Sequence, residues 1–144
     1  MVRIEPEEQD FDPENFTPQD AAAALRTGIE LFNAGSYHAA HEELEKCWLA
    51  NEGGDADFYK GLIQVAICMH HFARNNAEGA RKLYSGFRRL LAPYGEAHRG
   101  VALHDLLATM QQTMRAVLRG AADTDFDPQA RPLITFDASV NPAD

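Results

Sequence analysis

The segment between Phe58 and Phe72 constrains the fold most, because its apolar side chains occur on nearly every side of an α-helix. A helix of this kind is surrounded by other elements, whereas a surface helix carries a single apolar stripe. Gln64 interrupts the run, and the apolar stretch is too short to cross a bilayer. The segment is therefore predicted to be the central helix of a soluble bundle.

Start and stop signals predict four further helices around this central one. Thr17 is a typical N-cap, Pro18 fits the first helical position, and Gly35 is a typical stop. Ser36 and Asn76 are N-cap candidates for two other helices. The five expected helices run from Pro18 to Ala34, from Tyr37 to Ala50, from Asp55 or Asp57 through Phe72, from Asn76 to just before Pro93, and from about Leu103 to Gly120.

These helices are expected to form an all-α closed bundle of about five helices, built from two helical hairpins plus a C-terminal helix. Gly28, Tyr37 and Leu44 fall at spacings that resemble a tetratricopeptide hairpin, and Gly61 and Ala80 repeat the pattern loosely. Stacked repeats usually need three or more copies. Two hairpins and a fifth helix therefore fit a closed bundle better than an open array.

The chain divides into three predicted parts. Residues 17–120 form the helical domain, which follows a flexible N-terminal segment of residues 1–16. Residues 121–144 form an extended C-terminal tail, in which proline residues prevent helix formation. Apolar residues of this tail, such as Phe126 and Ile134, are in position to lie against the bundle.

The net charge of −9 argues against a general nucleic-acid-binding protein. The charge is uneven, since the segment from His70 to Arg99 carries six basic residues against only Glu78 and Glu96. A solvated helix face is the simpler interpretation of this segment. A binding site for an anionic ligand or partner is the other.

Cys47 and Cys68 lie inside helical patterns and lack CxxC or zinc-ligand spacing. They are expected to be buried thiols in a reducing compartment. The first residues contain no apolar run of signal-peptide length. These features predict a cytoplasmic protein that does not insert into membranes.

The helix over residues 37–50 carries the first half of a candidate site. His41, Glu45 and Trp48 recur at intervals of about one turn, and His41 and Trp48 lie within about 40° of Tyr37 around the helix. His41 is thus predicted to point toward the core. Glu45 lies at the edge of the apolar face, so the His41 and Glu45 side chains are able to meet.

The central helix carries the second half, because Gln64 and His71 are polar residues in apolar surroundings and share one stripe seven positions apart. If that stripe faces the helix over 37–50, the two helices enclose one polar pocket. Its predicted lining is His41, Glu45, Trp48, Gln64 and His71, with Tyr37 and Glu42 beside them.

This residue set suits a divalent metal ion such as Zn²⁺, Mn²⁺, Fe²⁺ or Ni²⁺. His41 and Glu45 supply two ligands from one helix, and His71 is the candidate third. His38, one turn before His41, is a further candidate whose direction is closer to solvent. The alternative interpretation is a hydrogen-bonded core pair of His41 and Glu45, since a buried polar group needs a partner. No GxSxG elbow, phosphate-binding glycine loop or paired Glu-x-x-His motif is present to indicate another chemistry.

Three stretches resemble a bacterial and archaeal family catalogued as domain of unknown function 309, namely residues 32–48, 59–64 and 75–80. The most specific element is a His, three residues, a Glu, two residues and a Trp or Tyr, which His41, Glu45 and Trp48 match. The likeness covers about Leu25 to Leu91. It implies a closed helical bundle, a cytoplasmic protein and a metal-binding role for the motif, without an assigned activity.

The leading hypothesis is a divalent-metal-binding bundle, in which any catalysis is metal-assisted hydrolysis by a bound water. The first alternative is a tetratricopeptide-like module that binds a protein or peptide partner, with His41 and Glu45 as a structural pair. The second is a pocket for a small organic anion, served by the basic face of the helix that Asn76 caps.

Overall fold

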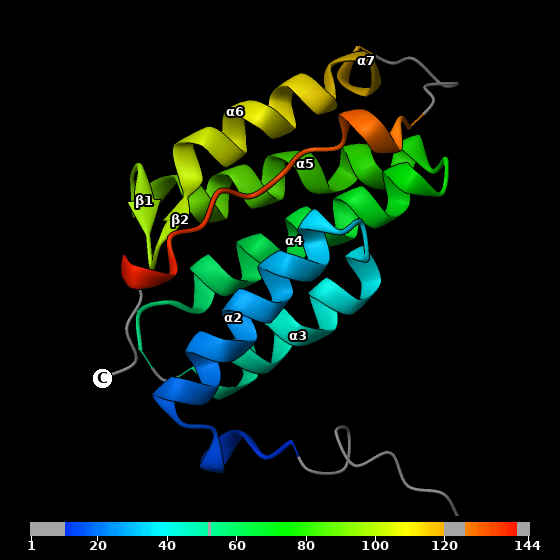
Figure 1. Ribbon diagram of the computed structural model, residues 1–144. Helices are drawn as coiled ribbons and strands as arrows, with labels where there is room; N and C mark the ends of the chain where they lie inside the picture. The colour runs from blue at the N-terminus through cyan, green and yellow to red at the C-terminus, as the bar shows by residue number, and fades with distance from the viewer. Residues whose placement is uncertain (1–10, 52, 120–125, 141–144) are drawn as a thin grey trace, which may run out of the picture.

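The computed structural model describes residues 11–51, 53–119 and 126–140, and helices dominate the described structure (Figure 1). Four long helices follow one another as two hairpins, and a further helix follows a short β-hairpin. The predicted all-α bundle of two helical hairpins and a C-terminal helix is confirmed. The helices are α2 (Pro18–Asn33), α3 (Tyr37–Ala50), α4 (Ala56–Ala73), α5 (Ala77–Leu91), α6 (Leu103–Thr113) and α7 (Arg115–Leu118).

The predicted fifth helix is divided, because Met114 leaves the helical conformation with φ −92° and ψ 6°. Met114 is fully buried, and its sulfur lies 3.9 Å from the Cys68 sulfur of α4, so the turn places this side chain in the core. The predicted stop at Gly120 lies outside the described residues. The remaining elements are the 3₁₀ helices η1 (Pro13–Asn15), η2 (Ala92–Tyr94), η3 (Pro128–Ala130) and η4 (Ala138–Val140), and the strands β1 (Ala97–His98) and β2 (Val101–Ala102).

The N-terminal end of α2 has the predicted cap. The Thr17 hydroxyl accepts a hydrogen bond from the Asp20 N–H at 3.0 Å, and the Asp20 carboxylate accepts one from the Thr17 N–H at 2.9 Å. This reciprocal capping box fixes where α2 begins. Residues 11–16, part of the predicted flexible segment, contain η1. Residues 1–10 of that segment lie outside the described residues, as do residues 141–144 of the predicted tail.

The two helical hairpins turn in the same way. Gly35 and Asn75 both have a positive φ, of 86° and 61°, at the ends of α2 and α4. The N–H that follows each of them donates to a carbonyl five residues back, from Ser36 to Leu31 and from Asn76 to His71, at 2.8 Å in both cases. This is the Schellman arrangement of a left-handed residue after a helix. The internal repeat is therefore a repeat of hairpin geometry.

Glycines set the distance between the paired helices. A Cβ atom on Gly28 of α2 would lie 2.8 Å from Leu44 Cγ of α3, and one on Gly61 of α4 would lie 2.6 Å from Leu91 Cγ of α5. Such separations are too short for carbon atoms in van der Waals contact. Each glycine thus leaves the space that a leucine of the neighbouring helix fills.

Helix α4 is the centre of the bundle, as predicted. It packs along α3 on one side and α5 on the other, and Cys68 reaches Met114 beyond α6. Ten of its eighteen residues are buried, so little of its circumference is left for solvent. Between Phe58 and Phe72, the residues that are not buried are therefore confined to one narrow strip, which consists of Lys60, Gln64, Ile67, His70 and His71.

The described part of the C-terminal tail runs back along the bundle as an extended strap (Figure 1). Asn33 at the end of α2 holds it with two hydrogen bonds. Its amide nitrogen donates to the Ile134 carbonyl at 3.0 Å, and its amide oxygen accepts from the Ile134 N–H at 2.7 Å. The Phe126 ring lies 5.5 Å from the Phe72 ring and 6.4 Å from the Tyr37 ring. The tail therefore adds apolar contacts to the core.

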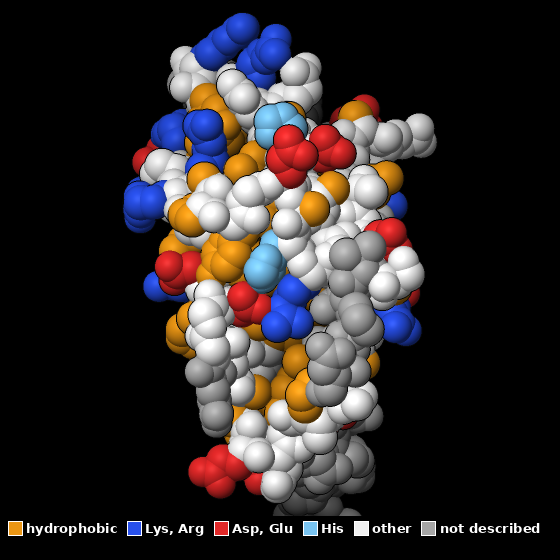
Figure 2. All heavy atoms as spheres, turned by 90° about the vertical axis from the view of Figure 1, so that its left-hand side faces the viewer, with side chains coloured by type: hydrophobic (Ala, Val, Ile, Leu, Met, Phe, Trp, Pro, Cys, Tyr) orange, Lys and Arg blue, Asp and Glu red, His pale blue; other side chains and the backbone are white. Residues whose placement is uncertain are grey.

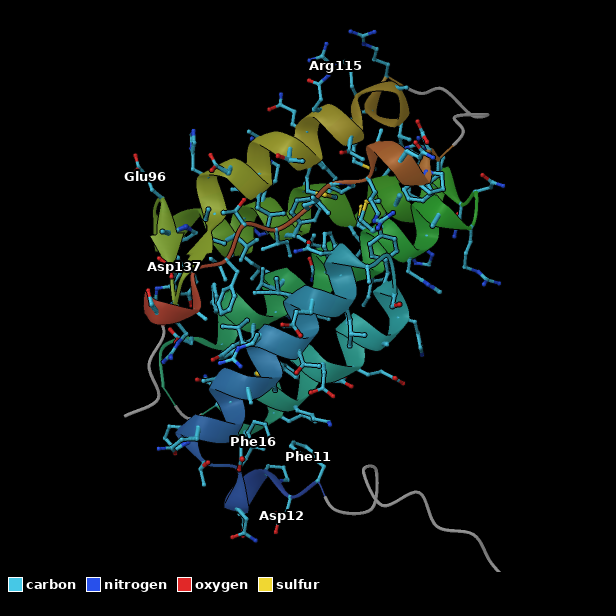
Figure 3. All side chains as sticks on the ribbon, viewed as in Figure 1. Phe11, Asp12, Phe16, Glu96, Arg115 and Asp137 are labelled. Carbon is cyan, nitrogen blue, oxygen red and sulfur yellow. The ribbon has the colours of Figure 1, made fainter. Side chains whose placement is uncertain are left out.

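The β-hairpin is covered by the same tail. Arg99 and Gly100 form its two-residue turn with φ of 49° and 82°, a geometry that matches the twist of antiparallel strands. The Ala102 N–H donates to the Thr135 carbonyl at 3.0 Å, and the Asp137 N–H donates to the Gly100 carbonyl at 2.8 Å. Figure 3 shows Asp137 beside the hairpin, at the opposite end of the bundle from Arg115.

Replacing Met69 with Asp is expected to unfold the protein, because Met69 is fully buried on α4 and an unpaired interior charge costs about 3–5 kcal/mol. The volume-conserving Met69→Leu variant should lose only about 1 kcal/mol. Thermal melts followed by far-ultraviolet circular dichroism measure both. A Met69→Asp protein that melts within a few degrees of the parent would contradict the central position of α4.

Replacing Asn33 with Ala removes both hydrogen bonds to Ile134 and should cost about 1–3 kcal/mol of unfolding free energy. The tail should also become susceptible to proteolysis, since Asn33 joins it to α2. Asn15→Ala is the matched control, because the Asn15 side chain bonds Asp12 in an exposed turn. Equal stability and equal tail cleavage in the two variants would show that Asn33 does not hold the strap.

Candidate functional site

The buried stripe of α3 consists of Tyr37, Ala40, Leu44 and Cys47. His41 and Glu45 lie half-buried on the flank of this stripe. Trp48 is 37% exposed. The prediction that His41 and Trp48 point to the core is therefore wrong. The residues directly before them in the sequence, Ala40 and Cys47, are buried instead. The physical reason is that the small residues Ala40 and Cys47, rather than their larger neighbours, occupy the close contact of α3 with the bundle.

Gln64 and His71 do share one stripe of α4, but that stripe faces α5 and not α3. A Cβ atom on Gly86 of α5 would lie 2.6 Å from the Gln64 amide oxygen, and one on Gly79 would lie 2.9 Å from His71 Cγ. The two glycines are seven residues apart, like the two polar residues that they receive. The predicted pocket between α3 and α4 therefore loses its Gln64 and His71 walls.

The predicted ligand set of His41, Glu45 and His71 is not brought together. Among the described residues, no three His, Cys, Asp or Glu side chains are arranged around a common position that would hold a metal ion. No hydrogen bond joins the described side chains of His41 and Glu45, and His41 Nδ1 pairs with the His38 carbonyl at 3.0 Å. The simple core-pair interpretation of His41 and Glu45 is therefore not met either.

Three imidazole rings do lie in contact where α3 begins and α4 ends. The ring centroids of His38 and His41 are 5.1 Å apart, and those of His38 and His70 are 5.5 Å apart. We call His38, His41 and His70 the imidazole cluster. His71 adjoins it at 6.1 Å from His70, but its ring turns toward α5. The cluster brings side chains from two helices to one half-exposed surface.

The hydrogen bond of His41 decides its tautomer. A backbone carbonyl only accepts, so the His41 Nδ1 must donate to the His38 carbonyl, and in the neutral ring Nε2 is then an unprotonated acceptor. Partial burial lowers the pKa of His70, and the positive charge of Arg74 and the neighbouring imidazoles lower it further. His38 is the most exposed member, and its Nε2 lies 3.3 Å from a Glu42 carboxylate oxygen.

The predicted pocket-lining residues Tyr37 and Glu42 lie apart from each other. Tyr37 is buried beneath the tail, with its ring 5.1 Å from the Phe32 ring, and burial raises the pKa of its hydroxyl. Glu42 is exposed and pairs with His38. Of the predicted site residues, His41 is thus the one that lies in the imidazole cluster. His38 was a minor candidate in the sequence, and His70 was missed, although it directly precedes His71.

A second polar cluster lies at the opposite end of α4. Asp55, just before the helix, accepts hydrogen bonds from the His98 ring at 2.9 Å and from the Arg99 guanidinium. The His98 ring lies 4.7 Å from both the Phe58 and Tyr94 rings. In Figure 2 this end of the bundle faces the viewer, with basic, acidic and histidine side chains next to one another. These contacts fasten the β-hairpin to α4.

The electrostatics of Asp55 follow from these partners. Burial alone would raise its pKa, but the hydrogen bonds from Arg99 and His98 outweigh burial and hold the pKa below the usual value. Sequence reasoning missed the cluster because Asp55 and His98 are 43 residues apart.

The expected pair of buried thiols is present, since Cys47 and Cys68 are buried and free, and burial raises the pKa of each to about 12.

Comparison with known sequences finds a family model that matches part of the chain. Residues 25–83, which contain α3, α4 and the beginning of α5, match the family model described as Domain of unknown function (DUF309). This is the family that the sequence resembles. The resemblance is confirmed over the matched residues, and the matched segment includes the whole imidazole cluster.

A relative from Aquifex aeolicus (strain VF5), described as an uncharacterized protein, is 27% identical over 94 residues. The match covers 65% of this chain and 28% of the relative's length. The chain therefore corresponds to less than a third of that protein. Within the described residues, no helix has the length and apolar character needed to cross a membrane.

The lowered pKa of Asp55 predicts how stability depends on pH. A carboxyl group whose pKa is depressed by folding stabilises the protein above its unfolded pKa of about 3.9, and this contribution disappears as the pH falls through the folded value. The stability gap between the parent and Asp55→Asn should therefore be largest near neutral pH and shrink below about pH 4. Urea unfolding across this range measures it.

Asp57→Asn is the control for that series, because Asp57 is exposed on the first turn of the same helix. The gap between the parent and Asp57→Asn should be smaller at neutral pH. A stability gap for Asp55→Asn that is independent of pH would show that the carboxylate charge is not what fastens the hairpin.

Proposed function

We propose that the protein binds a divalent transition-metal ion at the imidazole cluster, with His41 Nε2 as a ligand and His38 and His70 beside it. The observation that carries the proposal is the spacing of the rings, at 5.1 Å and 5.5 Å between centroids. Imidazoles that bind one tetrahedral ion through nitrogens at 2.0–2.1 Å have centroids about 5 Å apart. The contacts of the free protein thus approach the spacing that a shared ion requires.

The donor set fits such an ion. His41 presents an unprotonated Nε2, because its Nδ1 donates to a backbone carbonyl, and a hydrogen bond of this kind orients metal-binding histidines in general. The side chain of His38 is 63% exposed, so it can change rotamer at little cost. The depressed pKa of His70 favours the neutral ring that a metal ion needs. A change of rotamer of the exposed His38 would complete the site.

Two residues of the predicted ligand set, His41 and Glu45, remain candidates in this site. Glu45 lies one turn after His41 on the same flank of α3, where a carboxylate could serve as a further donor. His71 does not belong to the set, since it faces α5. A metal ion held by imidazoles polarises a bound water, so any catalysis here would be metal-assisted hydrolysis. The buried free thiols of Cys47 and Cys68 fit the proposed cytoplasmic location.

The test is isothermal titration of Zn²⁺ and Ni²⁺ into protein purified without a histidine tag. The parent should bind one ion, and His41→Ala should weaken binding by about 10-fold or more, as loss of a ligand does. His104→Ala is the matched control, because His104 is exposed on α6 and outside the cluster. Circular dichroism checks that each variant is folded. Absence of binding in the parent, or equal losses in the two variants, would contradict the proposal.

A further inference from the structure

The strip of α4 that faces α5 carries a second set of polar groups, separate from the imidazole cluster. Gln64 and His71 occupy its middle, against Gly86 and Gly79. Exposed basic residues flank them on both helices. We call this surface the donor face, and it consists of Lys60, Gln64, His71 and Arg74 of α4 and its C-cap with Lys82 and Arg89 of α5.

The Gln64 amide shows which of its atoms is available. Its oxygen is buried against Gly86 and has no hydrogen-bond partner among the described residues. Its nitrogen is not among the buried polar atoms without a partner, and no described group accepts from it. The amide therefore presents its N–H₂ group outward, and this group is a donor only.

His71 presents a donor for a related reason. The Asn76 side-chain oxygen accepts a hydrogen bond from the Gly79 N–H at 2.9 Å, which fixes the orientation of that amide. Its nitrogen must then donate to His71 Nδ1, 3.1 Å away. The proton of the neutral His71 ring consequently lies on Nε2, which is a second outward donor.

The charges around these donors have one sign. Lys82 and Arg89 each lie one helical turn from Gly86, and so flank the point where Gln64 meets α5. Lys60 and Arg74 lie one turn before Gln64 and one turn after His71. The nearby acids do not cancel them, since Glu78 pairs with Arg81 and Asp57 lies beyond Lys60 at the end of the strip.

From this arrangement we infer that the donor face binds an acidic peptide segment in a polyproline II conformation. Donors and cations together recognise carboxylates and backbone carbonyls, which are acceptors. Lys82 and Arg89 are seven residues apart, or about 10.5 Å along a helix. A polyproline II chain has three residues per turn and advances about 3.1 Å per residue, so two glutamates separated by two residues lie on one side of it, about 9 Å apart. The Gln64 amide lies between the two cations, where it meets the peptide backbone.

The net charge of −9 favours a short acidic segment over a long nucleic acid, because the whole molecule repels an extended polyanion. The inference does not depend on metal binding, since none of the donor face residues belongs to the imidazole cluster. The two proposals can therefore fail independently.

The test compares two fluorescein-labelled peptides of equal composition by fluorescence anisotropy with the full chain. One repeats Glu-Ala-Ala, so that glutamates recur every three residues, and the other groups the same glutamates together. The spaced peptide should bind more tightly, with an affinity that falls as salt is added. The double variant Lys82→Glu/Arg89→Glu should weaken it about tenfold. The Gln64 side-chain amide resonances should shift on binding in the parent.

Arg26→Glu is the charge control, because Arg26 is exposed on α2 and lies outside the donor face. It should leave the affinity for the spaced peptide unchanged. The inference is overturned if neither peptide binds, if both bind equally, or if the double variant and Arg26→Glu have the same effect. It is also overturned if polyuridylate binds more tightly than the spaced peptide through the same two residues, because the face would then be a nucleic-acid site.

Discussion

Burial of α4 is the constraint on which the rest of the structure depends. Its apolar residues occur around most of the helix. They are removed from water only when α3, α5 and Met114 all pack against it. The close approach of α5 requires Gly61, which leaves room for Leu91. The tail then closes the remaining side through Phe126 and the Asn33 hydrogen bonds. One narrow strip of α4 stays outside the core.

The residues of this strip face two different neighbouring helices. Successive residues of a helix point about 100° apart, so His70 and His71 cannot face the same neighbour. His70 lies toward α3 and contacts His38, whereas His71 lies toward α5 and contacts Asn76. The polar residues of α4 therefore serve two surfaces, an imidazole cluster with a free acceptor nitrogen and a donor face with cations. We propose the first as a site for a metal ion and the second as a site for an acidic peptide.

The fold could be predicted well from the sequence because helix ends and helix burial depend on residues that are close together in the chain. Thr17, Pro18 and Gly35 mark helix ends whatever surrounds them, and the apolar circumference of α4 requires neighbours. The candidate site was predicted less well because it depends on how each helix is rotated. The observed orientation of α3 differs from the predicted one by about one residue, so that Ala40 and not His41 lies in the core. Ala40 takes that place because its side chain is small enough for close packing.

Contacts between distant residues were beyond the same reasoning. Nothing near Asp55 indicates that His98 and Arg99 will reach it, since a two-residue turn far along the chain brings them there. The side of α4 that meets α5 was also hidden, although Gly79 and Gly86 share the seven-residue spacing of His71 and Gln64. Matching glycines to bulky polar residues across a predicted hairpin is a signal that would have found it.

The division of α4 into two surfaces is tested most directly by nitrogen–proton correlation spectra of the histidine rings during titration with Zn²⁺. One equivalent should shift the ring resonances of His38, His41 and His70, because these rings are in contact on the α3 side. The rings of His71, His98 and His104 should keep their positions. Shifts of His41 together with His71, and not with His38 or His70, would contradict the account, because α4 would then present both polar surfaces to a single site.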